Sequence, residues 1–183
     1  MKKFVTVLCV IAIFCAAALW CFELFEVRRT GTGNGAATVW DKEFQTFAND
    51  LCAECRTDEE KIQVFYTWIT SKITYDEEVE YSYQHFDASG ILSSKKGICF
   101  DIANLFAAMC RSQGIRCYVL DGYSRKDSSY KHTWNRVFFN GCWYNVDVTY
   151  DTVRLQEGKS PYGFISIGAY DTPDEDYVIT RLY

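Results

Sequence analysis

The feature that most constrains the fold is a change of hydrophobic period near the middle of the chain. From Cys99 onward, apolar residues recur with the spacing of one helix face. The positions are Ile102, Leu105, Phe106 and Met109. Gly114 follows as the expected helix end, because glycine accepts the left-handed conformation that closes many helices. Beyond Gly114 the pattern becomes that of strands, so helices are expected to precede strands, as in an α+β fold.

Asn140-Gly141 is the strongest turn signal in the strand region. A two-residue type I′ turn needs positive φ at both central positions, which this pair accepts. The turn is expected to join strands at 132–139 and 142–150, with Phe139 facing Cys142. Further strands are expected at 116–123 and 162–167, and a polar loop lies between the first of these and the hairpin.

The residues before Cys99 predict three helices. The first covers 40–55. The second begins at Thr57, where T-x-x-E with Glu60 forms a capping box, and it ends near Lys72. The third is short, at 87–94. The intervening segment, 75–86, is acidic and aromatic and is expected to be irregular.

An apolar segment precedes the folded part of the chain. The 19 residues Phe4–Phe22 carry no charge. As a helix they would be about 28 Å long, close to the roughly 30 Å hydrocarbon core of a bilayer. An uncleaved transmembrane anchor is one interpretation, and a cleaved signal peptide with a small-residue site at Ala16–Ala18 is the other. Both export the domain, so it is expected to be membrane-anchored and extracytoplasmic, or secreted.

These features divide the chain into three parts. Residues 1–29 are the signal peptide or anchor, and residues 30–39, rich in Gly, Thr and Ala, are a flexible linker. Residues 40–183 are one domain, long enough for a single core. The net charge of −5, without a basic stripe, excludes nucleic acid as a main partner.

Nine cysteines suggest a disulfide framework, but their placement argues against a complete one. Three lie in the apolar segment, where they act as small hydrophobic residues. If one of the other six is a nucleophile, an odd number remains, so one or two bridges are the most that we expect. Cys52 and Cys55 form a C-x-x-C at a helix end, for which a structural role, a disulfide and a metal site stay open.

Cys99 has the setting of a reactive thiol. A helix N-terminus favours the thiolate through its free N–H groups and its dipole. The same N–H groups stabilise an oxyanion, and the backbone N–H of Cys99 is the only such donor that the sequence identifies. The alternative is a buried structural cysteine.

The hairpin register adds a histidine and a carboxylate. With Phe139 opposite Cys142, His132 and Asp147 share one face of the sheet as diagonal neighbours, roughly 7–8 Å apart. A carboxylate at that distance reaches an imidazole nitrogen, orients the ring and stabilises its charged form. The only other histidine, His85, is expected at the surface or in a substrate groove.

Four segments resemble those of the transglutaminase-like superfamily. Gly97–Ala103 is similar to its G-x-C-x-x-x-A nucleophile segment, and Lys131–Asn135 contains an H-x-W-N. Trp143–Asp151 resembles its W-x-x-x-D-x-T-x-D segment, and Trp68–Asp76 its W-x-x-x-x-I-x-Y-D helix exit. The resemblance covers Thr57–Asp151. It implies a papain-like α+β core of the short bacterial type, with Cys99, His132 and Asp147 as the catalytic triad.

The resemblance implies chemistry but not a substrate, because the superfamily includes proteases, amidases, cross-linking enzymes and inactive domains. We expect a cysteine enzyme that forms a thioester from a peptide or Gln-type amide and requires no metal and no cofactor. The partners would be a protein or peptide, including cell-wall peptide, and the membrane through the N-terminal segment. Alternatives are a non-catalytic binding module, a true cross-linking transglutaminase, and a redox protein using Cys52 and Cys55.

Hydrolysis is expected over amine transfer. A transferase must exclude water while it admits an amine, which demands a closed tunnel or a lid. The chain has little material for a lid apart from the aromatic loop within 75–86.

Overall fold

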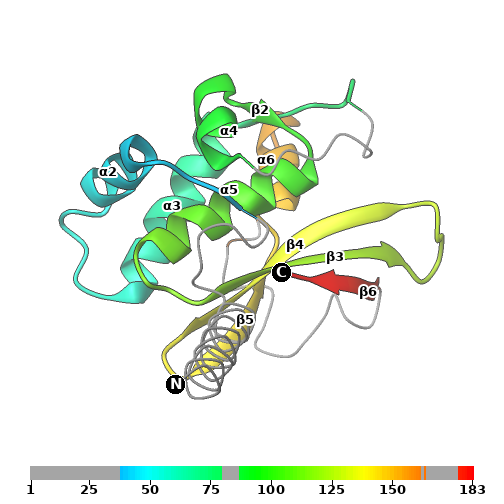
Figure 1. Cartoon of the computed structure of the whole chain (residues 1–183). Coiled ribbons are helices and arrows are strands. Elements are labelled where there is room, and N and C mark those ends of the chain that lie inside the picture. The colour runs from blue at the N-terminus through cyan, green and yellow to red at the C-terminus, as the bar shows by residue number, and fades with distance from the viewer. Residues whose placement is uncertain (1–37, 80–86, 162, 164–176) are drawn as a thin grey trace, which may run out of the picture.

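A helical layer packs on a four-stranded antiparallel sheet, as predicted for an α+β protein (Figure 1). The computed structural model describes residues 38–79, 87–161, 163 and 177–183. The strand order in the sheet is β5 (Cys142–Val146), β4 (Lys131–Phe139), β3 (Cys117–Ser124) and β6 (Tyr177–Leu182). Helix α5 (Cys99–Ser112) lies between the other helices and the sheet, and it contacts strands β3 and β4 directly. The main core is therefore built around α5.

Helices α2 and α3 form the outer part of the helical layer. Helix α2 (Lys42–Leu51) is shorter at both ends than predicted, because the Asp41 side chain caps its start and the chain turns at 52–54. Helix α3 (Asp58–Lys72) has the predicted capping box, in which Thr57 and Glu60 bond each other's backbone N–H.

Two short parallel strands connect the outer helices to α5. Strand β1 (Thr74–Tyr75) follows α3, and strand β2 (Lys96–Gly97) follows α4 (Ala88–Ser94). In their register Tyr75 lies opposite Gly97. Tyr75, which lies in the predicted helix-exit segment Trp68–Asp76, is therefore held beside the start of α5.

Helix α5 is buried over almost its whole length. It ends as predicted near Gly114, which has φ of +75°. Strand β3 (Cys117–Ser124) follows and pairs with β4 (Lys131–Phe139). These elements supply most of the hydrophobic contact between the two layers.

The Asn140-Gly141 turn is present, and Phe139 pairs with Cys142 as predicted. The predicted strand 142–150 is wrong beyond its first half, however. Strand β5 (Cys142–Val146) ends one residue before Asp147, and helix α6 (Val148–Gln156) follows. The Asp147 carboxylate accepts a hydrogen bond from the Tyr150 N–H at 2.9 Å, and this cap starts a helix where the side chains favour a strand.

The sheet is completed by a strand that was not predicted. Strand β6 (Tyr177–Leu182) pairs antiparallel with β3. Of the strand predicted at 162–167, only residue 163 lies within the described residues, so that prediction is not tested.

The N-terminal predictions fall on residues 1–37, outside the described part of the chain. Within the described residues, no helix combines the length and the hydropathy needed to cross a bilayer. Thr38 and Val39, from the segment predicted as a linker, contact the folded core. The Thr38 hydroxyl donates to the Asn104 carbonyl at 3.1 Å, and Val39 forms a bridge with Asp87.

Candidate active site

Cys99 is the first residue of α5, and the structure holds the residues around it closely. The side chain is 3% exposed. The Asp101 carboxylate accepts a hydrogen bond from the Ile98 N–H at 3.0 Å and so ties down the chain just before the thiol. A Cβ on Gly97 would lie 2.6 Å from the Cβ of Asp101, which explains the glycine. Cys99 therefore begins a helix whose entry is locally fixed.

His132 and Asp147 are in contact, as the hairpin register predicted. The His132 Nε2 and Asp147 Oδ2 atoms are 2.6 Å apart. The other carboxylate oxygen of Asp147 accepts the Tyr150 N–H, so the start of α6 fixes the carboxylate. Asp147 thus reaches His132 from a helix N-cap and not from a strand.

Cys99 lies within interaction range of the same imidazole. Its charge and a side-chain hydrogen bond contribute to raising the pKa of His132. The three residues form a chain of contacts from thiol to imidazole to carboxylate.

The charge state of His132 follows from its neighbours. Burial is the largest influence and disfavours the imidazolium, but the charge and hydrogen bond of Asp147, together with Cys99, outweigh it. The net result is that the pKa of His132 lies well above its ordinary value of 6.5. A protonated His132 carries a proton that it can donate to a leaving group.

Aromatic rings hold the imidazole in place. The Trp134 ring stacks against it with centroids 6.0 Å apart and an interplanar angle of 17°. Tyr177 from β6 lies 5.6 Å away, and Tyr130 lies 6.3 Å away. Ring packing and the Asp147 contact together restrict rotation of His132.

A second carboxylate, Asp151, anchors α6. The Tyr66 hydroxyl of α3 and the Gly163 N–H both donate to its Oδ2, the latter at 2.8 Å. Burial, followed by the hydrogen bond and the charge of Asp151, raises the pKa of Tyr66, so its phenol stays a donor. The last residue of the predicted W-x-x-x-D-x-T-x-D segment therefore supports Asp147 by fixing the helix that it caps.

Tyr75 is a candidate site residue that sequence reasoning missed. Burial raises its pKa to about 12, with smaller contributions from Cys99 and Tyr130, so it lies within electrostatic range of the thiol. The Gln156 side chain accepts its backbone N–H at 2.7 Å. The signal was its place in the Trp68–Asp76 segment, but only the pairing of β1 with β2 brings Tyr75 next to Cys99.

Among the described residues, the other sequence candidates, Cys52 and Cys55, do not join this group. His85 lies outside the described residues. Cys52 is buried at the end of α2, and its thiol donates to the Ala48 carbonyl at 3.1 Å, a structural contact. Cys52 and Cys55 are both free, like the four other cysteines that the structure describes.

Residues 45–148 match the model of the transglutaminase-like superfamily. The chain belongs to this superfamily. Its α+β architecture, with Cys99 at the start of the central helix packed on an antiparallel sheet, is the papain-like core that the sequence predicted.

Two curated relatives show the range of proteins that contain similar domains. Mouse kyphoscoliosis peptidase is 31% identical over 128 residues, which cover 64% of this chain and 19% of the relative. Hillarin of Drosophila melanogaster is 27% identical over 135 residues, 64% of this chain and 16% of the relative. The chain therefore spans less than a fifth of either relative.

Solved structures with low sequence identity share the fold. A Cytophaga hutchinsonii protein provisionally called a cysteine protease has a TM-score of 0.60 at 17% identity, over 85% of this chain and 46% of its own. The periplasmic domain of TgpA from Pseudomonas aeruginosa has a TM-score of 0.57 at 16% identity, over 72% of this chain and 51% of its own.

Proposed function

We propose that this domain of the transglutaminase-like superfamily is a cysteine acyl-transfer enzyme acting on peptide or Gln-type amide bonds, principally as a protease or amidase. The contact chain from Cys99 through His132 to Asp147 is the observation that carries the proposal. It combines a nucleophile, a proton carrier and an orienting carboxylate, which is the minimum set for thioester chemistry.

In the proposed reaction the Cys99 thiolate attacks the substrate carbonyl carbon. The imidazolium of His132 then protonates the leaving amine as the tetrahedral intermediate collapses to a thioester. Neutral His132 next takes a proton from water, and the hydroxide oxygen attacks the thioester. The acid product leaves, and the thiolate–imidazolium pair is restored. Asp147 orients His132 and stabilises its positive charge throughout.

Two donors stabilise the oxyanion in this proposal. One is the backbone N–H of Cys99 at the start of α5. The other is the hydroxyl of Tyr75, which stays protonated because its pKa is raised to about 12. Tyr75 comes from a different element than Cys99, so the pairing of β1 with β2 assembles this part of the site.

The comparisons support a peptide substrate and an extracytoplasmic location. One relative is named a peptidase, and one structural neighbour is a periplasmic domain. The uncharged run Phe4–Phe22 fits the same location, as an anchor or a signal. Protease added to intact cells should then degrade the domain, whereas complete protection without a secreted form would place it inside.

A non-catalytic binding module and a true cross-linking transglutaminase are the alternatives. The contact of Asp147 with His132 supports catalysis over simple binding, because a binding groove has no chemical need for an oriented imidazolium. Hydrolysis is preferred over transfer in this proposal because one relative is named a peptidase.

The decisive experiment supplies the purified domain with a Gln-containing protein and a labelled primary amine. Hydrolysis predicts backbone cleavage or a deamidation shift of about one mass unit, since an amide NH₂ is replaced by OH. Amine incorporation that exceeds both and disappears in Cys99→Ala would establish a transglutaminase. If no arm of the experiment shows a covalent change and Cys99 is also unreactive, the result supports the non-catalytic binding module.

A further inference from the structure

Asn135 is the last residue of the H-x-W-N segment, and the proposed reaction gives it no role. It lies in β4 and is completely buried, at 0% exposed. Its side-chain amide donates from Nδ2 to the Ala103 carbonyl of α5 at 2.9 Å and to the Tyr118 carbonyl of β3 at 3.3 Å. Asn135 therefore ties the central helix to two strands of the sheet.

The position of this tie relates it to all three residues of the candidate triad. His132 lies three residues before Asn135 in the same strand. Ala103 lies four residues after Cys99, which is about one turn, or about 6 Å, along α5. Across the sheet, Asn135 is opposite the last residue of β5, which directly precedes Asp147. The elements that carry the nucleophile, the imidazole and the carboxylate thus meet around Asn135.

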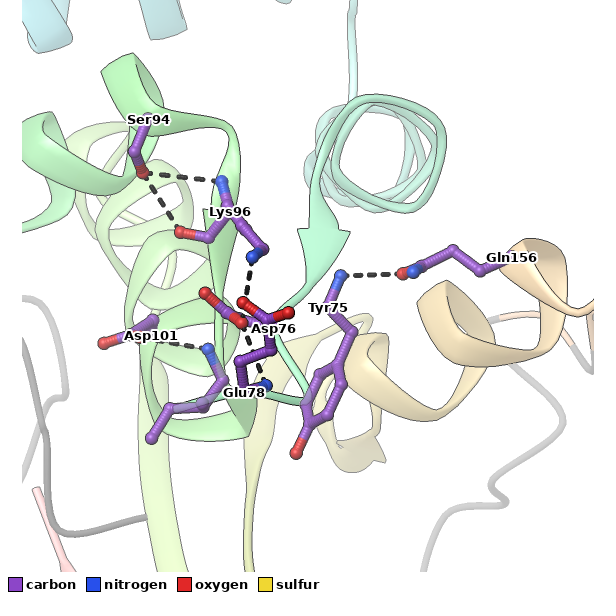
Figure 2. A network of polar contacts seen from close by, with 8 residues as sticks. Tyr75, Asp76, Glu78, Ser94, Lys96, Asp101 and Gln156 are labelled. Atoms are coloured by element: carbon purple, nitrogen blue, oxygen red, sulfur yellow. Dashed lines mark hydrogen bonds and ion pairs between the residues drawn. The ribbon is translucent and has the colours of Figure 1, made fainter. Parts of the chain in front are cut away.

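Other polar contacts hold the start of α5, but they connect it to different elements (Figure 2). The Asp101 carboxylate accepts the Ile98 N–H at 3.0 Å, which fixes the entry of the helix. The Lys96 ammonium of β2 lies 3.0 Å from the carboxylate of Asp76, the residue after β1. None of the contacts drawn in Figure 2 involves strand β4. They fix the helix entry and the β1–β2 pair, whereas the Asn135 amide joins the helix to the strand of the imidazole.

The amide of Asn135 adds less to stability than its two hydrogen bonds suggest. Ala103 lies inside α5, so its carbonyl already accepts a helical hydrogen bond, and Asn135 uses the second lone pair. Asn135 Oδ1 is buried and has no hydrogen-bond partner among the described residues, which costs free energy. A leucine of similar shape would remove that cost and leave the Ala103 carbonyl bonded. What the amide supplies, and leucine does not, is a directional link between helix and strand.

We infer that Asn135 is a positioning residue, which sets the placement of α5 against β4 and thereby the spacing between Cys99 and His132. The inference rests on the proposed function and adds a residue to its machinery. Because Asn135 is completely buried, it acts through the helix and the strand that it joins and not by touching a substrate. Proton transfer depends steeply on such spacing, since a displacement of about 1 Å costs about 10²-fold in rate.

The first test uses p-nitrophenyl acetate, an acyl donor that needs little recognition beyond its carbonyl. Attack by Cys99 forms an acetyl thioester and releases p-nitrophenolate, whose absorbance gives the acylation rate. Intact mass gives the rate at which water removes the acetyl group. Asn135→Leu should lower both rates about 10- to 100-fold, because His132 transfers a proton in each step. Its melting temperature should stay close to that of the wild type, which a purely stabilising role would not allow.

Asn104→Leu is the matched control. Asn104 is also 0% exposed, and its Oδ1 is likewise buried without a hydrogen-bond partner among the described residues. Its Nδ2 donates to the Phe100 carbonyl at 2.8 Å, so this bond stays inside α5 and links no second element. Asn104→Leu should therefore keep both rates close to those of the wild type. Equal losses in the two variants would show a general effect of leucine in this core and would overturn the inference.

The second test follows the titration of His132 by NMR and needs no substrate. Cys99 is among the groups that raise the pKa of His132. If Asn135→Leu lets the thiol and the imidazole move apart, the pKa of His132 should fall, whereas Asn104→Leu should leave it unchanged. An unchanged titration in Asn135→Leu would overturn the inference whatever the acylation rates are.

The wild-type protein separates failure of this inference from failure of the proposed function. If p-nitrophenyl acetate does not acylate Cys99 in the wild type, the proposed function falls and the inference falls with it. If the wild type is acylated and Asn135→Leu reacts equally fast, the positioning role alone is overturned. Should Asn135→Leu not fold, Asn135→Ala takes its place in both tests. Loss of folding in both variants would make Asn135 a stabilising residue and would also overturn the inference.

Discussion

The two ends of helix α5 carry cysteines in opposite situations. Cys99 at the first residue and Cys110 in the last turn are both buried, at 3% and 0% exposed. Cys99 contacts the His132 imidazole, whereas Cys110 contacts the thiol of Cys117. Burial, followed by the hydrogen bond and charge of Cys117, raises the pKa of Cys110 well above its ordinary value. One helix thus presents a thiol with an imidazolium partner and a thiol without one.

The difference teaches that burial is not what makes a cysteine a nucleophile. Both thiols are removed from water, but their neighbours differ. At the N-terminus, unbonded N–H groups and the His132 imidazole lie near Cys99, while the C-terminal end of the helix presents carbonyl oxygens. The surroundings of Cys99 and Cys110 therefore differ in the end of the helix on which each lies and in the presence of His132 beside Cys99.

The largest expected effect distinguishes these cysteines directly. Cys99→Ala should lower turnover by about 10⁴-fold or more, because no other group replaces the nucleophile. Cys110→Ala should keep nearly full turnover and lose roughly 1 kcal/mol of unfolding free energy through lost packing. Steady-state assays and urea unfolding of both variants check this. Residual activity in folded Cys99→Ala, or an equal loss in folded Cys110→Ala, would contradict the assignment.

Removing the negative charge of Asp147, which contacts His132, should lower the reactivity of Cys99 toward that of Cys110. We expect Asp147→Asn to reduce kcat by about 10²- to 10⁴-fold, since orientation and stabilisation of the imidazolium are lost. Asparagine still caps α6, so the fold should survive. Far-UV circular dichroism provides the control, and wild-type kcat in this variant would remove Asp147 from the mechanism.

The pH dependence of kcat/KM is a separate test of the contact between His132 and Asp147. Burial lowers the pKa of His132, but Asp147 and Cys99 raise it to a net value well above 6.5. The wild-type imidazolium should therefore persist through neutral pH, and kcat/KM should fall only when it deprotonates at alkaline pH. In Asp147→Asn this alkaline limb should move to lower pH. An unchanged limb would mean that another group controls it.

A smaller loss is expected for the proposed oxyanion donor. Tyr75→Phe removes one hydroxyl and should lower kcat by about 10- to 100-fold with little change in KM. Tyr130→Phe is a matched control, because Tyr130 also lies near the site but is 54% exposed. If both variants lose the same activity, Tyr75 has no special role.

The mildest test compares rates of alkylation in the native protein. At pH 7 iodoacetamide should modify Cys99 about tenfold faster than Cys142, although Cys142 is exposed, because the thiolate is the reacting form. Cys110 should react only after unfolding. Mass spectrometry of timed digests gives the order, and Cys142 or Cys110 reacting first would contradict the assignment of Cys99 as the reactive thiol.

Much of the site follows from local sequence. The apolar stripe after Cys99 and the glycine at 114 determine α5, because helix periodicity and a left-handed C-terminal residue are short-range effects. Asn140-Gly141 determines the β4–β5 register in the same way, and that register leaves Asp147, the residue after β5, on the side of His132 that it contacts. The superfamily and the three predicted site residues rest on these signals.

Tertiary structure decided the rest. Asp147 caps a helix instead of continuing a strand, since the Tyr66–Asp151 contact holds α6 against α3 and outweighs the strand preference of its Val and Thr residues. Tyr75 lies beside the start of α5 only because β1 pairs with β2, two segments about 20 residues apart in sequence. Such pairings depend on which surfaces pack together, and no short stretch of sequence contains that information.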